Sequence, residues 1–254
     1  MKCLASIYGL LMMFMLISCS TSTSDQPEIS IDENGYAILS DSQMEELVKR
    51  SYQYVAMYNV NNKFAMSQGG WNIMKADTVL KDHTMTDIAR PNNDTFYQGA
   101  VLDLRNEPVI VEFPPIDSKY VVLEASSYSH YCEVPMASSE GDFKKPAKVL
   151  FYTERTKGYQ GQPIKGVDRV VEADGDFLMT FLRAMPHQTD PDRMARVIQA
   201  LKDVKVVTLS EFQGKSAKDS GDAKFPPYGK TDTDVFENNL LEVMQFVFNH
   251  TTFD

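Results

Sequence analysis

The spacing of apolar residues divides the chain into a helical beginning, a strand-rich middle and a helical end. After Ser40, apolar residues recur every three or four positions, which predicts a helix that packs one face against a core. Ser42 and Glu45 fit a capping box at its start. Three closely spaced asparagines are expected to loosen or end this helix. The predicted face consists of Met44, Leu47, Val48, Ser51, Val55 and Tyr58, and the asparagines are Asn59, Asn61 and Asn62.

From Phe96 onward, apolar and polar residues alternate in short runs that are separated by turn residues, which is typical of β-strands. No helix-length segment separates the early runs, so a doubly wound parallel sheet is excluded here. The pattern predicts an α+β fold, with an antiparallel β-sandwich or barrel-like domain flanked by an N-terminal helix and C-terminal helices. Strands are expected at 96–104, 108–113, 119–126, 130–134, 148–153, 169–173 and 178–183.

The C-terminal part returns to helical spacing. Asp190 and Pro191 are typical of the N-cap and the first position of a helix, and residues 206–209 are predicted to form one more strand. Residues 213–230 form a polar segment that is long enough to be mobile or to lie against another subunit. A final helix at 234–249 has an apolar face that must be covered by the core, a second copy, a partner protein or a missing domain.

The N-terminal residues have the features of a targeting segment. Lys2 is followed by an apolar run at 7–17, which is too short to span a bilayer comfortably and is typical of a signal peptide. The run ends in Leu16-Ile17-Ser18-Cys19, which resembles the bacterial lipobox. The resemblance implies cleavage before Cys19 and acylation of that cysteine, whereas an ordinary secretory signal is the alternative. We therefore expect a membrane-anchored lipoprotein of the cell envelope, facing the periplasm or the exterior.

Charge and cysteine content narrow the classes of partner. The formal net charge is −10 at pH 7, and the acidic excess is spread along the chain, which argues against nucleic acid and against a basic face on anionic lipid. The cysteines are Cys3, Cys19 and Cys132. Once the signal is removed and Cys19 is acylated, Cys132 has no intrachain disulfide partner, and its apolar context predicts a small buried side chain.

The densest group of polar side chains is Arg90-Pro91-Asn92-Asn93-Asp94-Thr95-Phe96-Tyr97, directly before the first predicted strand of the β region. Turn formers followed by β-favouring residues predict a polar turn that leads into a strand. Asp94 with neighbouring amide oxygens could bind a hard cation, and Arg90 could hold a carboxylate or phosphate. We favour a third interpretation, in which these groups bond one another. The ligand-binding candidates are Arg90, Asn92, Asn93, Asp94, Thr95 and Tyr97, together with His130.

A second cluster lies at 128–133, where His130 and Cys132 would share one face of a strand. A cysteine and a histidine can form a nucleophile, and Glu133 or Glu124 could act as a base. Packing in the core or on the surface explains the same residues more simply. The histidines show no metal-binding spacing, so we expect no metal site. We assign no catalytic residue and no cofactor.

The order of motifs from about Arg90 to Lys215 resembles a bacterial family, domain of unknown function 1254. The resemblance rests on the 91–97 motif, Leu102-Asp103-Leu104, the apolar run 108–114 and Tyr120-Val121-Val122-Leu123, with weaker support from Lys157-Gly158-Tyr159, Gly161, Val170-Val171 and Arg183. It implies a β-rich domain that is often followed by a second domain, of unknown function 1214. That second domain would begin near Asp254. If the family's pocket lies between the two domains, this protein either lacks that pocket or completes it with a partner chain. The resemblance implies no established reaction.

Together these patterns predict the organisation of the chain and two functional hypotheses. The leading hypothesis is a non-catalytic envelope lipoprotein that binds a small molecule or a protein. The alternative is an envelope enzyme in which Asp94, His130 and Glu133 supply acid–base groups and Arg90 holds an anion. The predicted parts are a signal peptide at 1–18, a flexible tether at 19–28, a mainly helical part at 29–89, a β-rich domain at 90–215, and a loop with a C-terminal helix at 216–254.

Overall fold

The structure is a computed structural model, and it describes residues 29–85, 92–219 and 221–253. It contains two compact units, one reaching to Leu47 and the other from Val48 to the C-terminus. In the first unit, β1 (Ser30–Ile31) and β2 (Ala37–Ile38) form an antiparallel pair. The Asp32 carboxylate accepts hydrogen bonds from backbone N–H groups in the turn between them. The signal peptide and Cys19 lie outside the described residues.

The long helix α1 (Asp41–Gln68) crosses the boundary between the units and is longer than predicted. Its start is capped by Ser40 and Gln43, so the predicted box of Ser42 and Glu45 is wrong. The Ser40 Oγ accepts from the Gln43 N–H at 3.3 Å, and the Gln43 side chain accepts from the Ser40 N–H at 2.8 Å. A serine with a glutamine three residues later satisfies two N–H groups that the helix leaves unpaired.

The prediction that asparagines end this helix is also wrong, because tertiary contacts hold Asn59 and Asn62 inside it. Asn62 donates to the Tyr58 carbonyl at 2.8 Å and to the Tyr128 hydroxyl at 3.2 Å. Asn59 donates to Asp232 at 2.9 Å. All three asparagines are buried, as are Ser51, Val55 and Tyr58 of the predicted apolar face, whereas Met44, Leu47 and Val48 are exposed.

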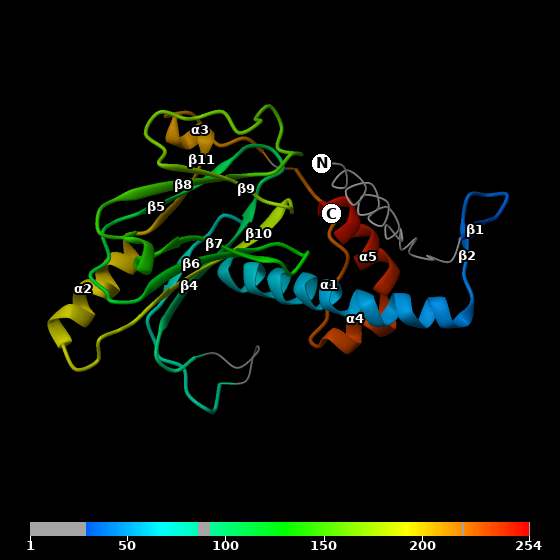
Figure 1. Cartoon of the computed structure of the whole chain (residues 1–254), viewed down its shortest axis with the longest axis horizontal. Helices are drawn as coiled ribbons and strands as arrows, with labels where there is room; N and C mark the ends of the chain where they lie inside the picture. The colour runs from blue at the N-terminus through cyan, green and yellow to red at the C-terminus, as the bar shows by residue number, and fades with distance from the viewer. Residues whose placement is uncertain (1–28, 86–91, 220, 254) are drawn as a thin grey trace, which may run out of the picture. The chain divides into compact units, whose positions relative to one another are not determined.

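Two sheets form the β region, and every strand predicted from alternation is present with small shifts of its ends (Figure 1). All neighbouring pairs are antiparallel except β8 with β9. The five-stranded sheet has the order β3 (Lys75–Asp77), β4 (Phe96–Asp103), β10 (Phe177–Ala184), β6 (Val121–Ser126), β7 (Cys132–Ala137). The four-stranded sheet has the order β11 (Lys205–Thr208), β5 (Val109–Phe113), β8 (Ala147–Tyr152), β9 (Arg169–Glu172).

The five-stranded sheet has apolar cores on both of its faces. One core lies between the two sheets and under α2 (Pro191–Lys202), whose N-cap is Asp190 as predicted. The other lies between the five-stranded sheet and the helices α1, α4 (Asp232–Asn238) and α5 (Leu240–Asn249). These two cores confirm the predicted α+β fold with packed antiparallel sheets and flanking helices. The remaining short helices are η1 (Ser138–Glu140) and α3 (Leu209–Phe212).

The predicted final helix is interrupted at Asn239, whose φ of −151° is not helical and separates α4 from α5. The loop before it is not free at its C-terminal end. Tyr58 donates to the Pro226 carbonyl at 2.5 Å, and Lys63 donates to the Lys230 carbonyl at 2.7 Å. On α5, Val243, Phe246 and Val247 are buried, while Leu241 and Phe248 stay exposed. The chain's own core thus covers part of this helix, and an oligomer or protein partner remains a prediction.

None of the helices in the described ranges combines the length and the apolar character that crossing a bilayer requires.

Candidate functional site

The predicted polar turn before β4 is present in its described part, while Arg90 and Pro91 lie outside the described residues. Asn92, Asn93 and Asp94 are exposed. Thr95 is buried, and its hydroxyl has no hydrogen-bond partner among the described residues. The Tyr97 hydroxyl accepts a hydrogen bond from the Asn92 N–H at 2.9 Å. This contact ties the turn to the strand that follows it.

Tyr97 also lies beside a charged pair on the same sheet. The Arg183 guanidinium stands 5.7 Å from the centre of the Tyr97 ring and forms an ion pair with Glu124 at 2.8 Å. Both charges are therefore engaged with each other, and Glu124 is not a free base.

His130 and Cys132 do not form the strand pair expected from their spacing. His130 lies in the turn before β7 with a positive φ of 72°, and it is exposed. Cys132 is also exposed, so the expectation of a buried thiol is wrong, because it sits on the edge strand of its sheet. Partial burial and the nearby Glu124 carboxylate raise the pKa of the Cys132 thiol. A raised pKa makes a thiol a poor nucleophile at neutral pH.

The register of the sheet separates Asp94 from His130. Phe96, Ala184 and Val121 are aligned in one row across β4, β10 and β6, and Asp94 precedes that row. His130 follows Ser126, which lies five residues further along β6, or about 17 Å at a strand's rise per residue.

Glu133, on β7, lies at the same end of the sheet as His130. Burial and the Asp174 carboxylate raise its pKa. The three groups of the enzyme hypothesis therefore do not converge in one pocket.

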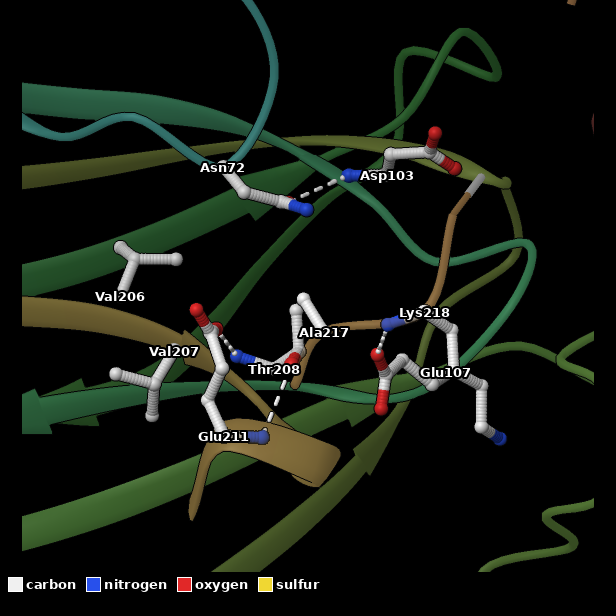
Figure 2. Close-up of a pocket in the computed structure, with 9 residues that line it drawn as sticks. All are labelled: Asn72, Asp103, Glu107, Val206, Val207, Thr208, Glu211, Ala217 and Lys218. Carbon is white, nitrogen blue, oxygen red and sulfur yellow. Dashed lines mark hydrogen bonds between the residues drawn. The ribbon is translucent and has the colours of Figure 1, made fainter. Parts of the chain in front are cut away.

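A groove that sequence reasoning did not predict lies between the ends of β4 and β11 and the loop that follows α3. It consists of two adjoining hollows of about 240 Å³ and 390 Å³, which share Asn72 and Asp103. Figure 2 shows the residues that line the smaller one. The smaller hollow is also lined by Glu107, Val206, Val207, Thr208, Glu211, Ala217 and Lys218. The larger is also lined by Trp71, Arg105, Asp219, Gly221, Asp222, Ala223 and Phe225.

Asn72 is fixed in place by backbone contacts with the last residues of β4. It has a positive φ of 58°, which asparagine tolerates better than most residues. Its N–H donates to the Val101 carbonyl at 2.8 Å, and its side-chain oxygen accepts from the Asp103 N–H at 2.9 Å. The side-chain nitrogen remains, and Figure 2 shows it pointing toward Thr208 and Ala217 across the smaller hollow.

We use the term clamp turn for the three consecutive residues 105–107, which follow β4 and hold the roof of the groove. We use the term roof segment for residues 217–219 and 221–225. Arg105 donates to the Gly221 carbonyl at 3.2 Å, and Asn106 donates to the Asp219 carbonyl. Glu107 accepts from the Lys218 N–H at 2.7 Å. The groove is therefore preformed, because its roof is fixed to the sheet at three successive points.

Glu107 is buried, yet it is held as a carboxylate. Burial raises its pKa, but hydrogen bonds from the Lys218 N–H, from Ser210 and from Thr208 outweigh this effect, so the pKa lies below its ordinary value. One carboxylate oxygen accepts from Lys218, and the other accepts from the Ser210 N–H at 2.8 Å. The carboxylate thus accepts hydrogen bonds from two N–H groups, and these bonds favour its charged form.

Replacing Glu107 with glutamine is expected to lower the free energy of unfolding by about 2 kcal/mol at pH 7, because a hydrogen bond to a charged acceptor is stronger than one to an amide. A carboxyl group with a depressed folded-state pKa contributes stability above its unfolded pKa and loses it as pH falls through the folded pKa. The wild-type advantage should therefore shrink in acid. Urea unfolding of both proteins between pH 7 and pH 3 measures it, and an advantage that is constant with pH would contradict the assignment.

The comparisons with known proteins concern the strand region. The family model described as "Protein of unknown function (DUF1254)" matches residues 72–208. Among solved structures, the VPA0106 protein from Vibrio parahaemolyticus is similar, with 22% identity and a TM-score of 0.60. The match covers 81% of this chain and 47% of that one, so this chain spans less than half of the Vibrio protein.

A second solved structure, of a putative uncharacterized protein from Burkholderia cenocepacia, has 14% identity and a TM-score of 0.36 over 82% of this chain and 51% of that one. No curated protein matches the chain.

Proposed function

Because the chain belongs to the DUF1254 family of proteins of unknown function, its role has to be inferred from its own geometry, and we propose a cell-envelope lipoprotein that binds a small molecule in the groove beneath the roof segment without transforming it. The envelope location rests on the sequence before the folded units. The apolar run at 7–17 and the Leu16-Ile17-Ser18-Cys19 motif support a lipid anchor, and the polar residues that follow support a tether.

The preformed groove is the observation that carries the binding role. A binding site whose walls are already fixed loses little conformational entropy when a ligand enters. Here the clamp turn fixes the roof, and Asn72 is locked with its side-chain nitrogen directed into the hollow. The smaller hollow is lined mainly by polar side chains, and Val206, Val207 and Ala217 form its apolar part, so it suits a ligand that offers several hydrogen-bonding groups.

The contacts of two carboxylates in the groove, those of Asp103 and Glu107, favour binding without a chemical reaction. Asp103 is 4% exposed and holds Arg105 through two hydrogen bonds, of 2.9 Å and 2.7 Å. Glu107 holds two backbone N–H groups. A general acid or base has to reach the reacting proton, and these carboxylates are already committed to holding the fold.

The sole tryptophan of the chain, Trp71, lines the larger hollow and therefore gives a single signal beside the groove. The test is ¹⁹F NMR of the full chain, labelled with 5-fluorotryptophan and held in a nonionic detergent. It is titrated with small alcohols, amides, amines and carboxylates as probes. We expect a saturable shift of the single resonance with at least one class of probe.

Two matched variants keep this experiment specific to the groove. Ala217→Phe fills the smaller hollow without adding a tryptophan and should weaken the response at least tenfold. Ser216→Phe changes the neighbouring exposed residue, which does not line the groove, and should leave the response intact. If no probe shifts the resonance, or if both variants respond like the wild type, the groove is not a binding site.

A further inference from the structure

The charges around the groove are unbalanced, and the excess is negative. Acidic side chains on its walls outnumber the two basic ones, Arg105 and Lys218. Arg105 is engaged with Asp103 and with the Gly221 carbonyl. Figure 2 shows the Lys218 ammonium pointing away from the space between Asn72 and Glu211. The groove therefore has no cation of its own directed into it from the residues that line it.

Two of the carboxylates beside the smaller hollow have no cationic partner within the described ranges. Glu107 interacts with backbone N–H groups. Glu211 belongs to the capping box of α3, where one of its oxygens, Oε2, accepts from the Thr208 N–H at 2.8 Å. Its other oxygen, Oε1, accepts no hydrogen bond from the part of the chain that the structure describes. In Figure 2 the Glu211 carboxylate lies between Val206 and Thr208, and Glu211 is exposed.

The opposite side of the same hollow offers a hydrogen-bond donor. The Asn72 side-chain nitrogen has no partner among the described residues and faces the hollow. A ligand that satisfies both sides must carry a positive charge with N–H donors at one end and an acceptor oxygen at the other. The hollow of about 240 Å³ equals the volume of about eight waters, so such a ligand has only a few non-hydrogen atoms.

We propose that the groove binds a small organic ammonium ion that also carries a hydroxyl or carbonyl oxygen, with the ammonium at Glu211 and the oxygen at Asn72. This inference rests on the proposed function and adds the chemical class of the ligand. Glu107 and Glu211 line the same hollow, so both carboxylates attract a cation that enters it, and because Glu211 is exposed this attraction weakens as the salt concentration rises. An anion is repelled by the same carboxylates, which separates this site from one that binds phosphate or carboxylate.

Ethanolamine is the probe, and the Trp71 ¹⁹F resonance of the full chain in nonionic detergent is the readout. At constant ionic strength we expect saturation with a Kd of about 1 mM, which is within the affinity ceiling for so few atoms. Ethylene glycol has a similar shape without charge, and tetramethylammonium has the charge without N–H donors. Both should bind at least tenfold more weakly. Short-chain phosphatidylethanolamine added to the micelles should also bind more weakly than the free amine, because its phosphate would face the carboxylates.

Glu211→Gln removes the charge and keeps the cap, because a glutamine oxygen can accept the same Thr208 N–H. Thermal unfolding should be nearly unchanged, and ethanolamine affinity should fall at least tenfold. Glu140→Gln, at an exposed position in η1 outside the groove, is the matched control and should bind like the wild type.

The outcomes separate this inference from the proposed function. If acetate or ethylene glycol shifts Trp71 as strongly as ethanolamine, or if Glu211→Gln binds ethanolamine as tightly as the wild type, the ligand class is wrong although the groove binds small molecules. If no probe of any class shifts Trp71, both proposals fail.

Discussion

Replacing Phe177 with alanine is expected to lower the free energy of unfolding by about 3–5 kcal/mol, which is the usual cost of deleting a buried phenyl ring. Phe177 is fully buried at the start of β10. Its ring centre lies 4.9 Å from that of Phe225, 5.1 Å from Trp71 and 5.8 Å from Phe246. One side chain therefore joins the sheet, the wall of the groove, the roof segment and α5.

The consequences of this substitution should reach the groove as well as the fold. Phe225 belongs to the roof segment, and without Phe177 it loses its contact with the sheet's aromatic core. Arg105 would also lose the ring that its guanidinium faces at 5.2 Å. We therefore expect a change in Trp71 fluorescence in the native state in addition to the loss of stability, because Trp71 packs on both rings.

Urea unfolding followed by circular dichroism measures the stability change, and Phe248→Ala is the matched control. Phe248 carries the same ring but is 55% exposed on α5, so its removal should cost well under half as much. Equal costs for the two variants would show that Phe177 does not hold these elements together.

The strands of the β region were predictable because each one carries its own signal. Residues of β5 alternate between two apolar clusters, with Val109, Val111 and Phe113 in the core between the sheets and Ile110 in a third, smaller cluster with Leu150 and Tyr159. Such alternation depends only on neighbouring residues. The N-cap at Asp190 could be read for the same reason, since cap and helix are adjacent in sequence.

The errors concern features that are decided by distant contacts. Local propensity favours ending a helix at an asparagine, yet Asn59 and Asn62 are satisfied by Asp232 and Tyr128, which lie far along the chain. Cys132 has apolar neighbours in sequence but lies on an edge strand, which only the strand order reveals. Tertiary structure overrides local preference at these positions.

The groove was not predictable, because it joins β11 and α3 to three further segments that have no common sequence signal. Trp71 and Asn72 follow α1, the clamp turn follows β4, and the roof segment follows α3. The polar turn at 92–97 was predictable as a candidate site because its polar residues are consecutive. Asn72 and Glu211, in contrast, line the same hollow although they lie far apart in the sequence.

Replacing Cys19 with alanine is expected to abolish lipid attachment completely, because the thioether that carries the lipid forms on this sulfur. Each buried methylene of an acyl chain contributes about 0.8 kcal/mol to membrane binding, and stable anchoring needs more than one chain. In cells fed radiolabelled palmitate, the wild-type chain should carry label, and the Cys19→Ala chain should carry none. Cys132→Ala is the matched control and should be labelled normally, since its thiol belongs to the folded region.

Incorporation of label decides this prediction better than membrane fractionation does. If the apolar run at 7–17 stays uncleaved in Cys19→Ala, that run can itself hold the chain at the membrane without any lipid. Mass spectrometry of the N-terminal peptide adds a second readout, because the wild type should begin at an acylated Cys19. An unlabelled wild-type chain that begins at any other residue would establish an ordinary secretory signal and remove the anchor from the proposed function.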